Sequence, residues 1–390
     1  MIGPALVNRG PGLQEQHPRV AIAHDYLTQH GGAERVVLAL HQIFPEAPIY
    51  TTLYEPQSTY PEFADADIRT GWLNKFAPFR ANHRYALPLY PLAVAMVNIN
   101  ADVVIASASA WAHGFHRTGK MIVYCHSPAR FLYQSQEYLG GPLWRSPEGI
   151  ALALLRRPMV RRDHRMATRA DRYLANSSVV RERIREIYGI EAEVVPPPAG
   201  RLRMDGPPPG NADALPGLSD WARSGYHLVV SRLLPYKNVQ TAVRAFAGMP
   251  GQRLVVVGDG PLRAQLNAEA GNNVRFLTGL SDTQLSWVYA HARALVAPSH
   301  EDFGLTPVEA ASYGIPTLAL RAGGYLDTVQ PGVTGLFFEH PTPHEISEAV
   351  LAAEARVWDA SAIRRHAAQF DQAHFARRIC AVVEEVLALP

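Results

Sequence analysis

The chain has 390 residues, and 47% of them are hydrophobic, which is enough to fill the cores of two domains of ordinary size. Its 37 basic residues nearly balance its 35 acidic ones, and the formal net charge of +2 excludes a global field that would recruit nucleic acid or membrane. The only two cysteines, Cys125 and Cys380, argue against a disulfide framework and favour a reducing, cytoplasmic compartment.

The N-terminal residues and the apolar runs do not predict a membrane segment. Residues 1–18 lack an apolar h-region, so we expect a disordered segment rather than a signal peptide. The run Leu89–Val97 is apolar but only about half the length of a membrane span, and no other run reaches that length.

Strands and helices alternate along the first half of the chain. Val20–Ala23 predicts a buried strand, Gly31-Gly32 a turn, and Ala33–Phe44 a helix. Further buried strands, interleaved with helical stretches, are expected at 48–52, 102–107 and 121–124. This order is typical of a parallel sheet.

A second unit of the same kind follows two proline clusters, 196–198 and 207–209, which predict a stiff linker. Its buried strands are expected at 226–230, 253–257, 274–276, 294–297 and 317–320. We therefore predict an α/β protein with two doubly wound domains facing each other. A ligand is expected between them, at the carboxyl ends of the strands.

The segment 301–309 sets two carboxylates, Glu301 and Glu309, eight residues apart across a predicted loop-to-helix junction. Thr306 is expected to be the N-cap, with Pro307 in the first helical position, so that free N–H groups and the backbone at Gly304 face an anion. An alternative stays open, because Thr306-x-x-Glu309 is also a capping box in which Glu309 satisfies only the backbone.

Two loops upstream add cations and glycines. Arg232 and Lys237 follow a predicted strand and suit a diphosphate, although such a pair is also usual in a solvated loop. The next strand runs into Gly258-Asp259-Gly260, which has only two of the three glycines of a dinucleotide fingerprint.

Taken in order, these motifs resemble the retaining GT-B glycosyltransferases of family four. The second half contributes Ser231-Arg232, Lys237, Gly258-Asp259-Gly260-Pro261, the two glutamates and Gly323-Gly324. The first half contributes HGGAERV at 30–36 and YCHSPARF at 124–131. Together with SHEDFGLTPVEA at 299–310, these motifs are similar to those of mannosyltransferases of bacterial surface-polysaccharide assembly. The resemblance covers roughly residues 19 to 375.

The resemblance implies two Rossmann-like domains across a cleft: 19–205 for the acceptor and 206–374 for the nucleotide sugar, with 375–390 crossing back to the first domain. It also implies transfer of a sugar, mannose from GDP-mannose, to a lipid-linked or glycan hydroxyl with retention of configuration. The nucleotide sugar is then a substrate, and no cofactor is expected. A nucleotide-sugar epimerase or a phosphorylase on the same architecture, or a binding regulator without turnover, stays as an alternative.

By resemblance, Arg232 and Lys237 neutralise the donor diphosphate and stabilise the leaving group. Glu309 receives the ribose hydroxyls, and Glu301 receives those of the donor sugar. Further donor contacts are implied for Gly31, Gly32, Gly258, Gly260, Phe303, Gly304 and Leu305. For Gly31 and Gly32 a simple turn is the alternative.

In the central segment, the resemblance places His126 against the donor sugar with no covalent role, and Arg130 at an acceptor phosphate. A satisfied core histidine is the alternative for His126. Asp25 is expected either to orient or deprotonate the acceptor hydroxyl, or to be an acidic turn residue. Cys125 is expected to be buried rather than nucleophilic.

No metal site is predicted. Asp65-x-Asp67 matches a metal-binding pattern of the other large glycosyltransferase fold, but the residues around it indicate a solvated loop. No pair of histidines four residues apart is expected on a helix near a glutamate.

The stretch 151–172 combines an apolar start with many arginines, among them Arg156, Arg157, Arg161 and Arg162. Such a helix could rest on an anionic cytoplasmic leaflet and bring the cleft to a lipid-linked acceptor. The alternative is a solvated helix whose arginines pair with Asp163 and Asp171.

Overall fold

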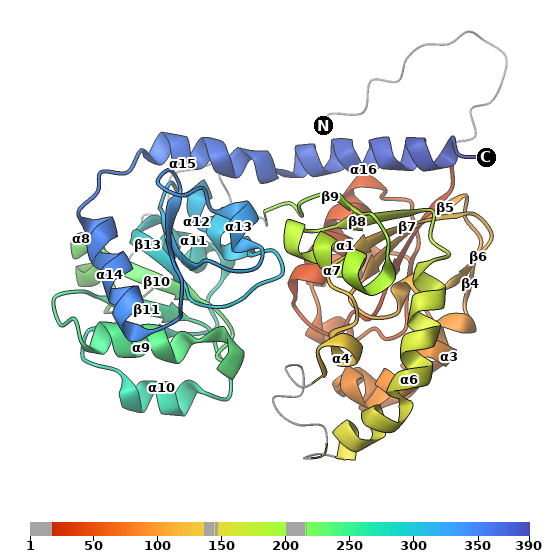
Figure 1. The fold of residues 1–390 in the computed structure, drawn as a ribbon, viewed down its shortest axis with the longest axis horizontal. Helices are drawn as coiled ribbons and strands as arrows, with labels where there is room; N and C mark the ends of the chain where they lie inside the picture. Colours follow the sequence, from red (N-terminus) through yellow and green to blue (C-terminus); the bar gives the residue numbers. More distant parts are fainter. Residues whose placement is uncertain (1–17, 136–143, 145–146, 200–214, 216) are drawn as a thin grey trace, which may run out of the picture.

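A computed structural model describes residues 18–135, 144, 147–199, 215 and 217–390. The expected N-terminal disordered segment and the proline cluster at 207–209 lie outside the described residues. Two α/β domains lie next to each other, and a helical C-terminal segment runs along one side of both (Figure 1). The predicted fold class, two doubly wound domains, is confirmed.

The N-terminal domain is built on a parallel sheet that sequence patterns predicted in part. From edge to edge its strands are β3 (Ile68–Thr70), β2 (Ile49–Thr51), β1 (Val20–His24), β5 (Val103–Ala108), β7 (Lys120–Cys125), β8 (Arg172–Ala175) and β9 (Glu193–Val194). A two-stranded sheet, β4 (Asn98–Ile99) with β6 (His116–Arg117), lies beside it. Its helices are α1 (Gly32–Ile43), α2 (Ala77–Ala81), α3 (Tyr90–Ala95), α4 (Arg130–Tyr133), α6 (Pro147–Ala167), α7 (Ser178–Tyr188) and α16 (Gln372–Leu387).

The C-terminal domain has a second parallel sheet. Its order is β12 (Val274–Leu277), β11 (Leu254–Val257), β10 (Tyr226–Val230), β13 (Ala292–Ala297), β14 (Thr317–Leu320) and β15 (Gly335–Phe338). The helices are α8 (Ser219–Ser224), α9 (Val239–Ala247), α10 (Arg263–Glu269), α11 (Asp282–Ala290), α12 (Leu305–Ser312), α13 (Tyr325–Thr328), α14 (Pro343–Glu354) and α15 (Ala360–Ala367).

Alternate residues of the central strands point to opposite faces of each sheet. In β5, Val103 and Ile105 belong to one core, and Val104 and Ala106 to the other. Because parallel strands are covered by helices on both faces, each strand is apolar throughout, which is why the runs were readable in the sequence.

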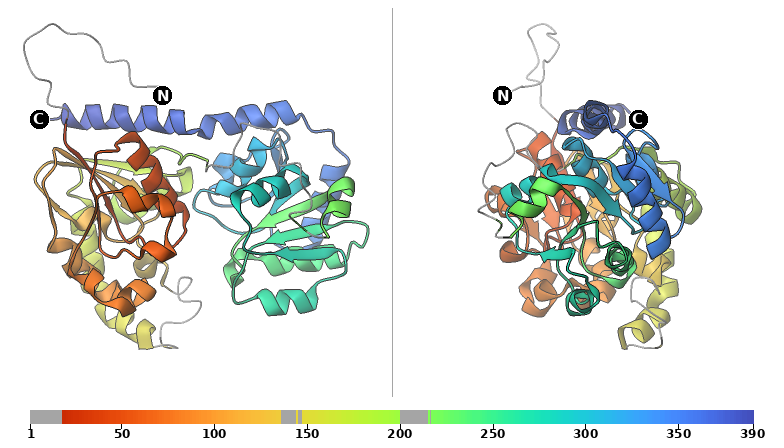
Figure 2. Two further views of the ribbon diagram at one scale, coloured as in Figure 1. Left: turned by 180° about the vertical axis from the view of Figure 1, so that it is seen from behind. Right: turned by 90° about the vertical axis from the view of Figure 1, so that its left-hand side faces the viewer.

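Helix α16 packs on the N-terminal domain although it follows the C-terminal one in the chain (Figure 2). Its apolar residues recur at helical spacing and join the core that holds Val37 and Leu40 of α1. They are Phe375, Ile379, Val382, Val383 and Val386.

The strand order determines where a ligand-binding crevice is expected. In each sheet the order reverses once, between β1 and β5 in the first domain and between β10 and β13 in the second. Loops leaving neighbouring strands at such a point turn to opposite faces of the sheet, which opens a crevice at the carboxyl ends.

Candidate active site

A cavity of about 490 Å³ lies between the two domains. Its walls come from the loops after the reversal points and from the segments around them. They include Gly31, Gly32, His126, Arg130, Arg232, Lys237, Glu301, Phe303, Gly304 and Leu305. The structure thus brings these ten sequence-predicted residues together, although they are spread along the chain from position 31 to position 305.

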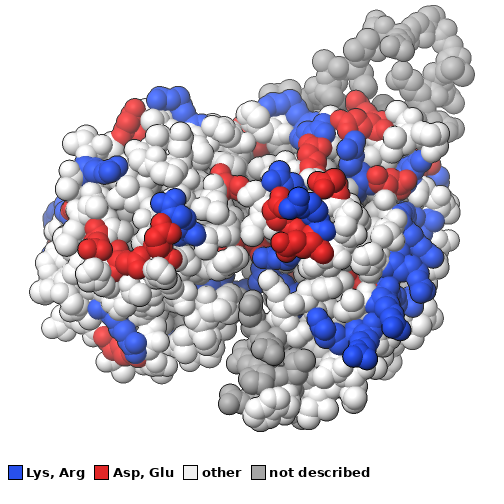
Figure 3. Space-filling view, viewed as in Figure 1, with Lys and Arg blue, Asp and Glu red and all other residues white. Residues whose placement is uncertain are grey.

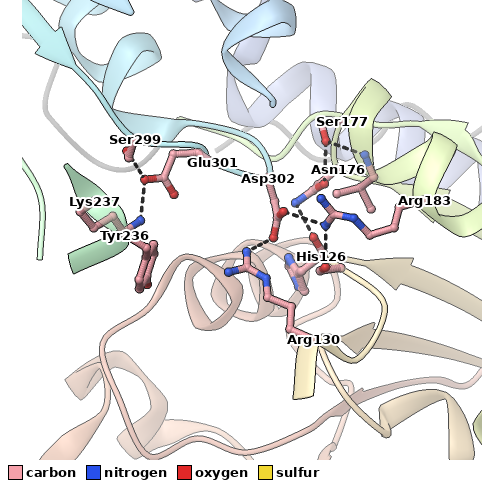
Figure 4. Close-up of polar contacts among 12 residues, drawn as sticks. His126, Arg130, Asn176, Ser177, Arg183, Tyr236, Lys237, Ser299, Glu301 and Asp302 are labelled. Atoms are coloured by element: carbon pink, nitrogen blue, oxygen red, sulfur yellow. Dashed lines mark hydrogen bonds and ion pairs between the residues drawn. The ribbon is translucent and has the colours of Figure 1, made fainter. Parts of the chain in front are cut away.

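One wall of the cavity carries a buried ion pair. Lys237, only 9% exposed, donates through Nζ to Glu301 Oε1 at 2.5 Å, and Ser299 donates to the same oxygen at 2.7 Å (Figure 4). The other oxygen, Oε2, has no hydrogen-bond partner among the described residues and can accept one from a ligand hydroxyl. Arg232 lines the same wall and donates to Tyr236 at 3.4 Å.

Asp302 joins the two domains at the cavity. It accepts from Arg130, and Arg183 Nη1 donates to its Oδ1 at 2.9 Å while also donating to Ser127 at 2.9 Å (Figure 4). Burial on its own would raise the pKa of Asp302, but Arg130 and Arg183 outweigh it and hold that pKa below its usual range. Arg130, expected at an acceptor phosphate, is therefore engaged with a carboxylate in this structure.

His126 lies at the end of β7 with its imidazole on the cavity wall. Its Nε2 shares a hydrogen bond of 2.8 Å with Ser107 Oγ, and its carbonyl accepts from Asn176 at 3.2 Å. Burial, reinforced by the nearby His24, lowers the pKa of His126 to about 3. The ring is therefore neutral at physiological pH, so it does not repel a positive charge that develops on a sugar.

The first turns of α1 and α12 face each other across the cavity. A Cβ at Gly32 would lie 3.3 Å from Leu305 Cδ1, so a larger residue there would crowd the opposite domain. Helix α12 begins at Leu305 after Gly304, whose φ of 90° suits glycine. The expected N-cap at Thr306 is wrong, because Thr306 already lies inside the first turn. Because residues of both first turns line the cavity, the unpaired N–H groups of the two helix N-termini are available to stabilise an anion there.

The capping-box alternative for Glu309 is wrong, and its carboxylate has other partners. It makes no capping box; Arg35 donates to its Oε1 at 3.0 Å, and Tyr289 donates to its Oε2 at 2.8 Å. Arg35 comes from α1, so this ion pair crosses from one domain to the other. Glu309 is only 6% exposed and is not among the residues that line the cavity. To receive ribose hydroxyls, it has to exchange these partners.

Asp25 requires a correction. It is buried, and its two oxygens accept four backbone N–H groups, from Ser109, Ala110, Trp111 and Ala112, at 2.6 to 2.9 Å. A carboxylate so fully engaged shapes the loop after β5 and does not reach an acceptor hydroxyl. The geometry therefore favours the alternative, in which Asp25 is an acidic turn residue.

Gly258 and Gly260 also do not line the cavity. They pack directly behind the loop that carries Arg232: a Cβ at Gly258 would lie 1.9 Å from Ser231 O, and one at Gly260 2.6 Å from Leu233 O. In this structure they let two loops approach closely.

The α6 arginines lie away from the cleft. Arg156 donates to Leu132 O at 2.6 Å and Arg162 to Pro91 O at 2.8 Å, while Arg157 and Arg161 are exposed. The alternative in which Asp163 pairs with them is wrong. Asp163 is fully buried, accepts from the hydroxyls of Tyr133 and Tyr188 at 2.7 Å each, and has its other oxygen 3.1 Å from His113 Nε2.

Two features of the described residues bear on metal binding and on a thiol nucleophile. Asp67, of the Asp65-x-Asp67 pattern, pairs with Arg69 at 2.6 Å on the surface. The parts of the chain that the structure describes contain no group of three histidine, cysteine, aspartate or glutamate side chains placed to hold a metal ion. Cys125 is buried, and burial raises the pKa of its thiol.

Two family models match successive parts of the chain. One, described as Glycosyltransferase Family 4, matches residues 30–199, and the other, described as Glycosyl transferases group 1, matches residues 223–368. The chain is a GT-B glycosyltransferase of the family four and group 1 type. The first match spans the domain with His126, and the second spans the domain with Arg232, Lys237 and Glu301.

Among known proteins, this glycosyltransferase is similar to human alpha-1,3/1,6-mannosyltransferase ALG2, at 27% identity over 82% of the chain and 83% of that protein. It is also similar to the D-inositol 3-phosphate glycosyltransferase of Nocardia farcinica, at 33% identity over 53% of the chain. The chain spans about half of that relative's length, 51%.

Solved structures support the fold. The glycosyltransferase superposes on Anabaena HepE in complex with UDP-glucose with a TM-score of 0.68 at 20% identity, covering 95% of the chain and all of HepE. It superposes on WaaG, a glycosyltransferase of lipopolysaccharide biosynthesis, with a TM-score of 0.59 at 17% identity, covering 93% and 99% of the two chains.

Sequence reasoning missed Arg35, Ser107 and Arg183 in this glycosyltransferase. Arg183 sits on α7, whose N-cap Ser177 follows the end of β8 directly. The missed signal was Asn176-Ser177-Ser178, a capping sequence that places a helix at the carboxyl edge of the sheet, where the cleft lies. Arg35 lies in the first turn of α1, next to Glu34. Its pairing with Glu309 could not be predicted, because the sequence does not show how the two domains are placed relative to each other.

Proposed function

We propose that this glycosyltransferase moves mannose from GDP-mannose to a hydroxyl of a lipid-linked or glycan acceptor, with retention of anomeric configuration. The observation that carries the proposal is the wall formed by Arg232, Lys237 and Glu301, opposite the first turn of α1. Similarity to a human mannosyltransferase over most of the chain supports mannose as the sugar. A structural neighbour in complex with UDP-glucose supports a nucleotide-sugar donor.

The wall fits the charge that develops during transfer. As the bond between the sugar and the diphosphate breaks, negative charge grows on the diphosphate oxygens. Arg232 and Lys237, together with the N–H groups at the two facing helix N-termini, stabilise that charge. Glu301 Oε2 accepts from a hydroxyl of the donor sugar and orients it, while Lys237 holds Glu301 in place.

We base the proposal of retention without a covalent intermediate on the contacts of the carboxylates in the cavity. The described residues that line the cavity include three carboxylates, Glu34, Glu301 and Asp302. Glu34 accepts from Gln29 at 3.0 Å, and the other two accept from lysine or arginine, so each of the three carboxylates already holds a neighbouring donor. The acceptor oxygen then forms its bond to the anomeric carbon on the face that the diphosphate leaves, and the acceptor proton passes to a diphosphate oxygen.

The surface of α6 supports an acceptor held at a membrane. Basic side chains form a continuous band over this helix, on the side of the N-terminal domain that faces away from the other domain (Figure 3). Large apolar side chains accompany them: Ile150, Leu154 and Leu155 on α6 are 50%, 77% and 43% exposed. In the described ranges no helix is both long and apolar enough to cross a membrane. We therefore place the enzyme peripherally, on the anionic inner leaflet.

A donor panel tests the reaction. Purified protein is incubated with GDP-mannose, UDP-glucose, UDP-galactose and UDP-N-acetylglucosamine in the presence of polyprenyl-diphosphate glycans, and products are read by mass spectrometry. The expected result is addition of one hexose from GDP-mannose, with an α-linkage by NMR. An inverted linkage overturns retention, and transfer from a UDP-sugar alone overturns mannose. Epimerised nucleotide sugar, sugar phosphate, or no turnover with tight binding points instead to the epimerase, the phosphorylase or the regulator.

A further inference from the structure

A second cavity, of about 250 Å³, lies in the N-terminal domain. It is formed where the C-terminal end of α6 meets the segment from η5 (Ala112–Gly114) to β6. We call it the α6 groove. Its lining residues are His113, Gly114, Phe115, His116, Arg117, Arg162, Arg165, Met166 and Arg169. No lining residue is shared with the cleft between the domains.

Cations dominate the α6 groove. Four arginines line it, and no carboxylate does. Two acids lie next to the groove. Asp163 is buried, accepts from two tyrosines and lies 3.1 Å from His113, and Asp171 accepts from the backbone of Met121 at 2.7 Å and lies 3.7 Å from Arg117, so two carboxylates stand against four arginines. The groove therefore keeps an excess of positive charge.

The arginines differ in how they are used. Arg162 and Arg117 are anchored, since Arg162 donates to Pro91 O and Arg117 donates to Arg169 O at 2.5 Å. Burial lowers the pKa of Arg117, Asp171 opposes this, and Arg169 lowers that pKa further, which is the sign of cations crowded together. The side chains of Arg165 and Arg169 have no hydrogen-bond or ion-pair partner within the part of the chain that the structure describes.

The two unpaired arginines lie close together at the end of α6. Arg165 is in the last turn of the helix and Arg169 in the turn that directly follows it, and both line the α6 groove. Guanidinium groups in such an arrangement bind phosphate oxygens with paired hydrogen bonds, and a carboxylate of the protein would already have neutralised them if the cluster served stability alone. Cavity size limits the ligand to a small head group.

We infer that the α6 groove binds a ligand carrying two or more phosphate charges, such as a diphosphate or the phosphate head of an anionic lipid. The site is separate from the donor diphosphate site, because the two cavities share no lining residue. The inference does not rest on the identity of the sugar or the acceptor.

The first test uses inorganic pyrophosphate as the probe and isothermal titration calorimetry as the readout. Wild-type protein is expected to bind at two sites, the cleft and the α6 groove. The Arg165→Ser/Arg169→Ser variant should lose one site, with at least tenfold weaker affinity there. Arg157→Ser/Arg161→Ser removes the same charge from exposed positions of the same helix outside the groove, and should keep both sites. Equal loss in the two variants overturns the inference, because it indicates unspecific attraction.

A third variant distinguishes pyrophosphate binding in the cleft from binding in the α6 groove. Arg232→Ala/Lys237→Ala should remove the cleft site and leave the groove site, so failure of the proposed transferase site and failure of the groove are told apart. Arginine modification by phenylglyoxal provides a second readout: pyrophosphate should protect Arg165 and Arg169 from labelling. Absence of protection at saturating pyrophosphate, together with a single site in wild type, overturns the inference for a soluble phosphate.

Vesicles decide the source of the phosphate. Phosphatidylcholine vesicles with and without phosphatidic acid are compared with pyrophosphate as competitor. Protection of Arg165 and Arg169 only by phosphatidic acid vesicles assigns the groove to a lipid head group, and protection by pyrophosphate assigns it to a soluble phosphate as well. No protection by either probe overturns the inference altogether.

Discussion

Arg35 and Glu309 lie 274 residues apart in the chain and form an ion pair of 3.0 Å between the two domains. Tyr60 accepts a second hydrogen bond from the same guanidinium at 2.9 Å, and Tyr289 holds the other oxygen of Glu309. Burial alone would lower the pKa of Arg35, yet Glu309 and Tyr60 raise it, so the arginine stays charged. The glutamate that the family resemblance assigns to the ribose is therefore also a contact that holds the domains together.

Glu309→Gln separates these two roles. If Glu309 receives ribose hydroxyls, the affinity for GDP should fall about tenfold, which corresponds to about 1.4 kcal/mol. Calorimetry with GDP and UDP measures it. Tyr289→Phe is the matched control, since it removes a hydrogen bond to the same carboxylate without touching its charge, and it should leave the affinity within about threefold. Unchanged GDP affinity with a lower melting temperature would limit Glu309 to joining the domains.

Lys237→Ala and Arg232→Ala should lower kcat by about a hundredfold to a thousandfold, because each removes a cation from the leaving diphosphate in the transition state. Steady-state kinetics with the preferred donor check this. Arg244→Ala, on the exposed side of α9 where the arginine pairs with Glu269, is the control and should leave kcat unchanged. Wild-type kcat in either cleft variant contradicts the assigned role.

Asp25→Asn should destabilise the protein more than it slows the enzyme. The asparagine amide cannot accept from two of the four backbone N–H groups that Asp25 now satisfies, and each buried unsatisfied donor costs about 1–3 kcal/mol. Urea unfolding gives the loss of stability, and kcat is measured on the folded fraction. Wild-type stability combined with a large drop in kcat would restore the acceptor-base role.

The low pKa of His126 predicts how stability depends on pH. An unfolded histidine takes up a proton near pH 6.5, whereas His126 in the folded chain does so only at about 3. Between these values the unfolded state binds more protons, so the contribution of His126 is present above pH 6.5 and is lost as the pH falls, by up to about 1.4 kcal/mol per pH unit.

His126→Gln should therefore flatten the fall in the free energy of unfolding between pH 6 and pH 4, measured by urea unfolding in a series of buffers. His83 and His227, whose pKa values burial lowers to about 4, keep part of the slope in the variant. His116→Gln, at an exposed position, serves as the control. An identical slope in wild type and His126→Gln would mean that His126 is already charged in the folded protein.

Membrane association is tested by co-sedimentation with vesicles. At low salt the protein should sediment with anionic liposomes, and replacing Arg156, Arg157, Arg161 and Arg162 by Ser should release it. Each arginine near the surface adds about 1 kcal/mol, and added salt screens this attraction. Equal sedimentation of both proteins, or none with either, would leave recruitment of the acceptor to the cleft alone.

The sequence allowed most of the buried strands to be predicted, but it left β8 and β15 undetected together with the shorter, more polar strands. Strands 226–230 and 317–320 match β10 and β14 residue for residue, because both are buried on two faces and end at clear turn signals. Strand β3 was missed: its central Arg69 is exposed at the sheet edge, so no apolar period marks it. Strand β9 has only two residues, and its identity depends on pairing with β8.

For the site, the residues that line the cleft could be predicted in part, whereas their interaction partners could not. Residues at strand ends, such as His126 and Lys237, could be assigned to the cleft because strand ends meet at one edge of a sheet. Partners could not: Glu309 had a local explanation in its own first turn, whereas its real partner is Arg35 in the other domain. Similarly, nothing local shows that four N–H groups from residues 109–112 converge on Asp25.

Helix α16 has a consequence for how the protein is made on the ribosome. The apolar face of α1 is covered by Phe375, Ile379, Val382, Val383 and Val386, which leave the ribosome last. The N-terminal domain is translated first, but it is completed only after the C-terminal domain has been translated. The apolar face of α1 therefore stays exposed to solvent while residues 217–370 are being synthesised. Vectorial synthesis places the aggregation hazard in the N-terminal half of the nascent chain, where a chaperone would have most to cover.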